Sequence, residues 1–309
     1  VTTGAPVTIA GIVSSPGDET ATLQLSRDLI VGDVVSLNVG AGRVVQSLSG
    51  PRVAVESFPV TLDFAAPYDL PGAFAHYRGD VMPTSGSNVL SVTDQEGVFG
   101  NLIKGGAGTV TTVGVGGKTW WKTSATGYLK ADKGSSQVIA SGAILVKFRL
   151  VSTAGAQAIV ATGLNGSPTA QGLTVLLASG LVYLRRASNN GSTGDAADMN
   201  GANTAAHDAV ITWRNTGTTR ADMFIDGLCD AASIDAVTVD AISRLCLGVW
   251  PDLSGIPGEI EYGDVWLGTS WLAGADGEGN NALGKAPVAD SDAAKACNYL
   301  DGSDGGYWA

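Results

Sequence analysis

Three carboxylates near the end of the chain have the clearest potential for catalysis. They lie in the segment Glu259-Ile260-Glu261-Tyr262-Gly263-Asp264. Alternate side chains of a β-strand share a face, so Glu259 and Glu261 would point the same way. The next position on that face is Gly263, and Asp264 reaches it only across a bulge. Because two carboxyl groups about 5 Å apart can cleave a glycosidic bond, this spacing raises a hydrolase as one alternative.

Tryptophan is the second informative residue type, with seven copies against six phenylalanines. Trp250 lies in the turn-rich segment Trp250-Pro251-Asp252-Leu253, outside any strand pattern. An exposed aromatic ring beside a carboxylate suits sugar binding, because the ring stacks on the apolar sugar face while the carboxylate accepts hydroxyl hydrogen bonds. Trp120 and Trp121 are adjacent, so they must face opposite sides of a strand, and one would be exposed if the sheet has a wet face. Core packing is the simpler alternative for any single tryptophan.

The sequence therefore indicates five candidate carbohydrate-contacting residues, which we expect at one rim of the fold. Trp250 and Asp252 lead, followed by Trp121, Asp94 and Asp226. Asp226-Gly227 has a simpler explanation as a type I′ hairpin turn, since both central positions of that turn need positive φ.

Metal and thiol chemistry have little support. His76 and His207 are isolated, and Cys229, Cys246 and Cys297 show no ligand-like spacing. We predict no tightly bound transition metal, no cofactor and at most one weakly bound calcium. The cysteines are expected to be small buried hydrophobes, with a Cys229–Cys246 disulfide as the lesser alternative.

The charge balance limits the partners. With 18 basic and 29 acidic residues the net charge is −11, which argues against nucleic acid or an anionic membrane surface, because both need a basic stripe. No apolar run approaches the 18 residues of a membrane span. At 44% hydrophobic and 15% charged residues, the chain is expected to fold into packed cores.

Two all-β patterns must position these residues. Residues 1–66 contain short apolar runs at about ten-residue spacing with Gly, Pro and Asp turns between them, which predicts a small β-sandwich. Prolines between Asp63 and Pro71 mark the predicted boundary. Residues 72–309 form a longer pattern of strands. It includes a hairpin around Ser179-Gly180, a polar loop over 187–206 and one helix over 290–300 with Ser291 or Asp292 as N-cap.

The first pattern resembles the Ig-like repeats of bacterial surface and phage appendage proteins. The run from Leu23 to Val45 carries this resemblance, with Gly32-Asp33 at the turn between two strands.

The second pattern resembles the concanavalin A-like, or laminin-G-like, jelly roll. Four segments in the right order carry the match over about 225 residues: 73–80 with 91–102, 113–129, 207–227 and 245–272. The sequence departs from the family at Tyr77, where the family has Trp, and at Glu96, where it has Ser. Glycosidases of this jelly roll carry E-x-D-x-x-E on one strand, whereas binding-type members do not need those carboxylates.

The combined prediction is an all-β protein with an Ig-like β-sandwich, a concanavalin A-like jelly roll and a short C-terminal helix. The resemblances imply a non-catalytic carbohydrate-binding protein, extracellular or on a virion, such as a phage tail or head fibre. Its partners would be cell-surface polysaccharide and other virion or surface proteins, with homo-oligomers as a further expectation. The alternatives are a purely structural virion component, and a glycan hydrolase using Glu259, Glu261 and Asp264.

Overall fold

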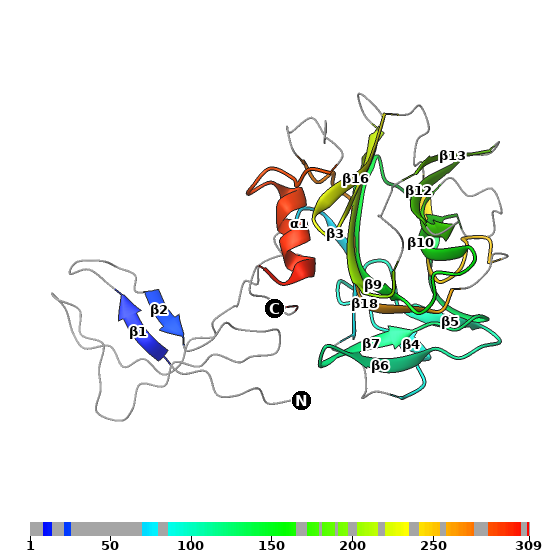
Figure 1. The fold of residues 1–309 in the computed structure, drawn as a ribbon, viewed down its shortest axis with the longest axis horizontal. Coiled ribbons are helices and arrows are strands. Elements are labelled where there is room, and N and C mark those ends of the chain that lie inside the picture. Colours follow the sequence, from blue (N-terminus) through cyan, green and yellow to red (C-terminus); the bar gives the residue numbers. More distant parts are fainter. Residues whose placement is uncertain are drawn as a thin grey trace.

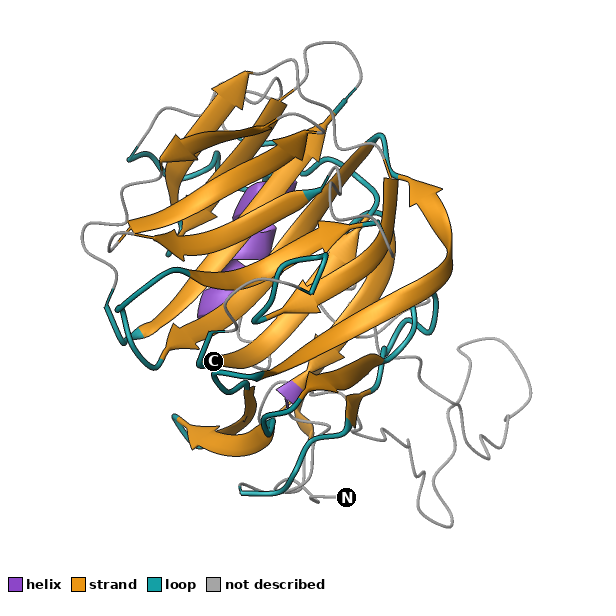
Figure 2. Ribbon diagram, turned by 90° about the vertical axis from the view of Figure 1, so that its right-hand side faces the viewer, coloured by secondary structure: helices purple, strands orange, loops and turns teal. Residues whose placement is uncertain are grey.

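The structure is a computed structural model in which strands dominate (Figures 1 and 2). It describes residues 9–13, 22–25, 70–79, 86–164, 172–178, 181–188, 191–196, 203–215, 220–234, 241–253, 258–274, 284–303 and 308. Within these ranges the only α-helix is α1 (Asp292–Asp301), near the C-terminus. The predicted all-β class with one short C-terminal helix is therefore confirmed.

The N-terminal region contributes one described pair of strands. β1 (Ile9–Val13) and β2 (Thr22–Leu25) pair antiparallel, with a bulge between Ile9 and Gly11. The rest of the predicted Ig-like module and most of the predicted boundary lie outside the described residues. The division into 1–66 and 72–309 stays a prediction.

Two antiparallel sheets form the larger unit. We call the first the turn-covered sheet, with strand order β13-β12-β11-β10-β17-β8-β5-β4. Its strands are β4 (Ser91–Val92), β5 (Leu102–Gly106), β8 (Gly127–Val138), β10 (Gln157–Gly163), β11 (Leu173–Ala178), β12 (Leu181–Ser188), β13 (Gly191–Ala196) and β17 (Ala241–Leu247).

The second, the helix-covered sheet, has strand order β16-β15-β14-β9-β18-β7-β6, with β3 pairing along part of β18. Its strands are β3 (Ala73–Arg78), β6 (Thr111–Val115), β7 (Lys118–Lys122), β9 (Ser141–Leu150), β14 (Ala206–Arg214), β15 (Arg220–Ile225), β16 (Leu228–Ile234) and β18 (Ile260–Gly268).

The main core lies between the two sheets, and a second core lies between the helix-covered sheet and α1. Ile144, Val146 and Phe148 of β9 face the first core, while Ala143 and Leu145 face the second. This is why the segment 143–150 is apolar at nearly every position, since alternation is lost where both faces of a strand are buried. Figure 1 shows the resulting layers, with α1 against one sheet and β10, β12 and β13 in the other.

Local signals set the ends of α1. The Ser291 hydroxyl accepts a hydrogen bond from the Ala294 N–H, as its predicted N-cap role requires, and Gly302 ends the helix at φ 84°. Ala293 and Ala296 are buried against the sheet, where small side chains allow close approach.

One part of the sequence prediction is wrong. The polar segment 187–206 was expected to be a loop, but β13 within it pairs with β12 from Ser188↔Gly191 to Tyr183↔Ala196. A strand at the end of a sheet needs only the backbone groups of its neighbour, so its sequence can lack apolar alternation.

Among the described residues, α1 is the one α-helix, and it is too short and too polar to span a membrane.

Candidate functional site

The turn after β17 holds the two leading candidates, Trp250 and Asp252. The Leu253 N–H donates to the Trp250 carbonyl at 2.9 Å, which closes a β-turn with Pro251 at its second position. Pro251 is buried, whereas Trp250 and Asp252 are partly exposed. The turn therefore leaves Trp250 and Asp252 partly accessible and covers Pro251.

Arg244 anchors this turn to the sheet. Its Nη1 donates to the Pro251 carbonyl at 2.8 Å, and its Nη2 donates to Asp132 at 3.1 Å. Lys130 also contacts Asp132, so Lys130, Asp132 and Arg244 form a charged row across β8 and β17. Burial alone would raise the pKa of Asp132, but hydrogen bonds from Arg244 and Lys130 outweigh it and lower that pKa below its usual value.

The strand register places this row on the outer face of the turn-covered sheet. Leu245 and Ala131 pair with each other and lie in the core between the sheets. Their neighbours Arg244 and Asp132, which also pair, must then face outward. Cys246 is on the same outer face. Burial raises the pKa of its thiol to about 12, and the negative charges of Asp132 and Asp252 add to this effect.

Tyr128 is a residue of this face that the sequence reasoning missed. It precedes Lys130 by two positions in β8, so it points outward, and it is partly exposed. It packs against the small cluster of Ala161, Cys246 and Val249 together with Leu253 of the turn. The available signal was the pair Gly105-Gly106 inside an apolar strand, because glycine in a strand often marks a close approach.

We call this surface the turn-side face. It comprises the outward side chains of β5, β8 and β17 with the turn itself: Ile103, Tyr128, Lys130, Asp132, Arg244, Trp250, Asp252 and Leu253.

Trp121 is not exposed, contrary to expectation. It is 0% exposed and stacks on Tyr262 in the core between the sheets, with ring centroids 6.1 Å apart. Trp120, on the opposite side of β7, meets Trp308 edge to face at 5.8 Å and is also buried. The prediction that one of the pair faces water is wrong, because the C-terminal segment covers the outer face of this sheet.

Asp94 is also buried, and its carboxylate serves the loop after β4. Oδ1 accepts from the His76 and Glu96 N–H groups at 3.0 and 3.1 Å. Oδ2 accepts from the Phe99 and Gly100 N–H groups, both at 3.0 Å. Four backbone donors occupy this carboxylate, so Asp94 holds a loop in place and has no surface available for a ligand.

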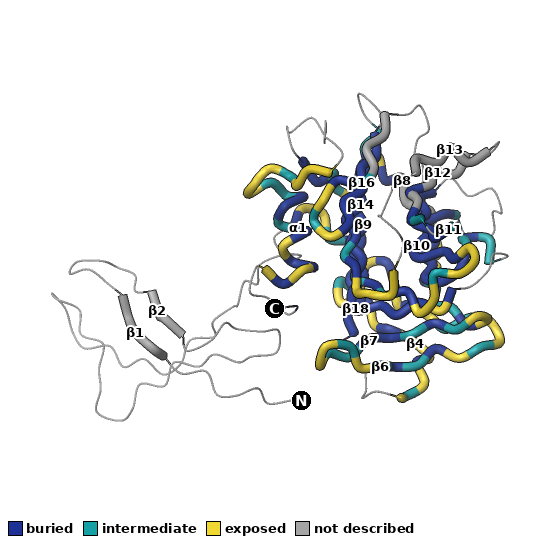
Figure 3. Tube along the Cα trace, viewed as in Figure 1, coloured by how far each residue is buried: buried dark blue, intermediate teal, exposed yellow. Residues whose placement is uncertain are grey.

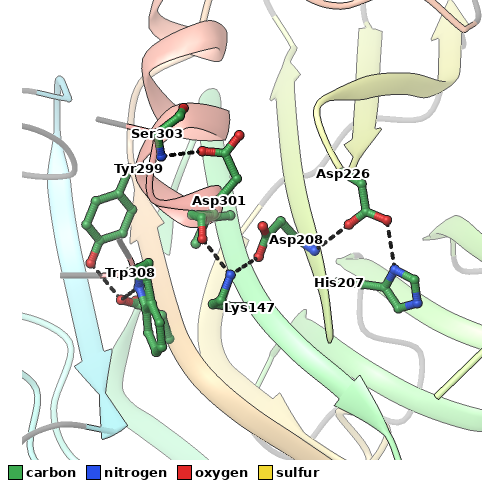
Figure 4. A network of polar contacts seen from close by, with 10 residues as sticks. Lys147, His207, Asp208, Asp226, Tyr299, Asp301, Ser303 and Trp308 are labelled. Atoms are coloured by element: carbon green, nitrogen blue, oxygen red, sulfur yellow. Dashed lines mark hydrogen bonds and ion pairs between the residues drawn. The ribbon is translucent and has the colours of Figure 1, made fainter. Parts of the chain in front are cut away.

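Asp226 is half exposed at the turn between β15 and β16, on the helix-covered sheet. Its φ of 49° and the φ of 77° at Gly227 agree with the predicted type I′ geometry. Figure 4 shows its carboxylate between two groups of β14, the His207 ring at 2.8 Å and the Asp208 N–H at 2.9 Å. The structure thus brings Trp250 and Asp252 together but leaves Asp226, Asp94 and Trp121 on other elements.

Glu259, which precedes β18, shares a face with Glu261 and Asp264 of that strand, but not in a form that supports hydrolysis. The strand has the expected register shift between Tyr262 and Asp264. Asp264 is 0% exposed and accepts hydrogen bonds from His76 Nε2 at 3.0 Å, Tyr299 Oη at 2.6 Å and Trp308 Nε1 at 3.2 Å. Figure 4 shows Tyr299 of α1 next to Trp308. A carboxylate sealed in this way cannot reach a substrate.

The other two carboxylates, Glu259 and Glu261, each lie beside a cation. Glu261 is buried and bonded to Arg149, while the exposed Glu259 lies 3.5 Å from Lys122. Each is therefore paired separately, and Asp264 is not available to complete a catalytic set.

The cysteines are buried free thiols, so the Cys229–Cys246 disulfide alternative is wrong. Cys229 belongs to the second core, on the outer face of the helix-covered sheet, and its backbone is hydrogen-bonded to Gly284 and Lys285. Cys246 lies beneath the turn, on the outer face of the other sheet. Among the described residues, no group of three or more His, Cys, Asp and Glu side chains could hold a metal ion.

Comparisons with known proteins identify the fold. No protein-family model matches the sequence, and no curated protein matches it. Domain 4 of AbnA, a GH43 extracellular arabinanase from Geobacillus stearothermophilus solved in complex with arabinotriose, matches with a TM-score of 0.51 at 11% identity, over 73% of this chain and 98% of that one. The binding domain of botulinum neurotoxin DC, in complex with rat synaptotagmin II, matches with a TM-score of 0.50 at 12% identity, over 74% of this chain and 52% of that one.

The chain spans about half the length of the botulinum toxin binding domains that it matches. At these identities the likeness concerns the fold alone. The chain has the β-sandwich fold of these domains.

Proposed function

We propose that this protein is a non-catalytic carbohydrate-binding adhesin whose contact site is the turn-side face. The observation that carries the proposal is the turn itself: Arg244 holds its backbone, Trp250 and Asp252 on it are partly exposed, and its Leu253 packs against the same small cluster as Tyr128. Partly exposed aromatic rings beside carboxylates match both the apolar face and the hydroxyl edge of a sugar.

Rigidity supports this assignment. The turn is held by its own hydrogen bond, by Arg244, and by a 3.0 Å bond from the Gly258 N–H to the Gly248 carbonyl at its base. Side chains that are already ordered lose little entropy when a ligand binds.

The structural neighbours agree with a binding role. One is a domain in complex with arabinotriose, and another is a toxin binding domain in complex with rat synaptotagmin II. The first favours an oligosaccharide ligand, and the second makes a protein ligand the main competitor.

The setting we propose is the exterior of a cell or virion, as part of a phage tail or head fibre that contacts host-surface polysaccharide. The support is the resemblance of the N-terminal sequence to Ig-like appendage repeats and the acidic charge of −11. In the structural alternative, a neighbouring virion protein or a second copy of this chain would cover the turn-side face and no sugar would bind.

The test compares two partly exposed tryptophans. Trp250→Ala should weaken binding to a responsive polysaccharide by about tenfold or more and change the free energy of unfolding by less than about 1 kcal/mol. Trp271→Ala is the matched control, because Trp271 lies after β18 beside Arg214 on the other sheet and should leave binding unchanged. A glycan array identifies the ligand, and thermal unfolding checks the fold. If the wild-type protein binds no glycan, or if both variants bind equally well, the proposal fails.

A further inference from the structure

Tyr128 lies flat on the sheet because the strand beside it has no side chain there. Tyr128 pairs with Gly105 of β5 on the outer face. A Cβ atom on Gly105 would lie 2.3 Å from Tyr128 Cε2 and 2.6 Å from Cζ. Since a Cβ on this face points away from the sheet, the ring must cover the glycine. A Cβ on Gly106 would likewise come within 3.1 Å of Cε1.

The ring is therefore a platform with one face on β5 and an exposed remainder. Ile103, two residues before Gly105 on the same face, is 50% exposed and extends the apolar surface along the strand. Leu253 of the turn packs against the same small cluster as Tyr128, on the side of β17. A flat apolar strip thus runs from Ile103 past Tyr128 toward the turn.

The charged groups of the turn-side face cancel. Lys130 and Arg244 supply two positive charges, and Asp132 and Asp252 supply two negative charges. Asp132 contacts both cations, so neither of them is left to attract an anion strongly. This balance differs from the net charge of −11 on the whole chain, which would repel an acidic polymer.

We infer that the turn-side face binds uncharged sugar residues of a polysaccharide, with Tyr128 as the stacking platform. The inference rests on the proposed function and names its ligand class. The apolar face of a neutral sugar ring lies on Tyr128 and Ile103, and its hydroxyl groups reach the oxygens of Asp132 and Asp252 and the amine of Lys130. These charged side chains act as hydrogen-bond partners, so binding depends little on salt.

The experiment uses matched polymers that differ in charge. Neutral probes are dextran, linear arabinan and fully methyl-esterified polygalacturonate, and acidic probes are unesterified polygalacturonate and hyaluronate. The full chain should bind at least one neutral polymer, with an affinity that changes less than about threefold between about 50 mM and 500 mM NaCl. Esterified polygalacturonate should bind at least as tightly as its free acid.

Three variants test the platform. Tyr128→Ala should weaken neutral-polymer binding by about tenfold, whereas Tyr128→Phe should keep it within about threefold, because the ring alone supplies the contact. Gly105→Ala keeps the tyrosine but displaces its ring, so it should also weaken binding. Thermal unfolding of each variant shows whether it has folded.

The possible failures are distinguishable. Binding restricted to acidic polymers, with strong salt dependence, overturns this inference and leaves the proposed function standing. Neutral-polymer binding that Tyr128→Ala leaves intact in a folded protein also overturns it. If no polysaccharide binds and Tyr128→Ala converts a dimer to a monomer in sedimentation, the face is an interface between copies of this chain and both proposals fail.

Discussion

The outer faces of the two sheets carry similar residue types in opposite situations. On the helix-covered sheet, Trp120 and Trp266 are buried beneath α1 and the C-terminal segment. On the turn-covered sheet, Tyr128 and Trp250 are partly exposed beside a short turn. Figure 3 shows β9 and β14 of the helix-covered sheet as largely buried. Aromatic residues thus serve packing on one face and remain available for binding on the other, according to what covers them.

The carboxylates of the two faces follow the same contrast. Asp264 is sealed and receives three side-chain donors from β3, α1 and the C-terminal segment. Asp132 remains partly exposed between two cations. A buried carboxylate such as Asp264 holds together elements that are distant in sequence by hydrogen bonds. A partly exposed carboxylate such as Asp132 can also contact a ligand.

The largest expected effect is on the helix-covered side. Asp264→Ala should lower the free energy of unfolding by about 3–5 kcal/mol, because it leaves three buried donors without their acceptor. Glu259→Gln, at the exposed position just before the same strand, should change it by less than about 0.5 kcal/mol. Urea denaturation followed by tryptophan fluorescence measures both. Similar losses in the two variants would contradict the contrast between sealed and accessible carboxylates.

An intermediate effect concerns the thiols. Burial raises the pKa of Cys229, Cys246 and Cys297 to about 12 each, so all three should react slowly at pH 8 in the native protein. Cys246 should react about tenfold faster than the other two, because a short turn opens more readily than a packed helix. Timed alkylation followed by peptide mass spectrometry assigns each rate. A faster reaction of Cys297 would contradict this expectation, because it would show that α1 opens more readily than the turn.

The smallest effect is a pair of opposite pH dependences. The hydrogen bonds from Arg244 and Lys130 lower the pKa of Asp132, so its stabilisation is present above about pH 4 and is lost as the pH falls through the folded-state value. Burial raises the pKa of Asp208, despite its bond to Lys147, so folding gains stability as the pH falls through that raised value.

Two variants measure these dependences as differences from wild type. The stability lost in Asp132→Asn should be under about 1 kcal/mol at pH 7 and shrink toward pH 3, because the site is partly exposed. The wild-type advantage over Asp208→Asn should grow over the same range. Thermal unfolding at several pH values gives both curves, and slopes of the same sign would refute the assignment.

Local signals in the sequence determined much of the fold. Two apolar runs around Ser179-Gly180 predicted the strands of the hairpin β11–β12, and the Asp226-Gly227 pair predicted a type I′ turn. Ser291 predicted the start of α1. Each of these depends on residues within a few positions, whose backbone preferences and hydrogen bonds act without the rest of the chain. By sequence spacing, Asp264 could share the face of Glu259 and Glu261 only across a bulge, and the structure has a register shift between Tyr262 and Asp264.

Exposure was decided only by the tertiary structure. The sequence around Trp121 cannot reveal that the opposite sheet covers it, nor that Trp308, almost 190 positions later, covers its neighbour Trp120. Only the strand register shows that the Tyr128 ring lies over Gly105, which makes Tyr128 a candidate ligand contact. Only the structure shows that four backbone N–H groups donate to the Asp94 carboxylate, which removes Asp94 from the candidates. A side chain is accessible or buried according to elements remote in sequence, and no local propensity records where those elements pack.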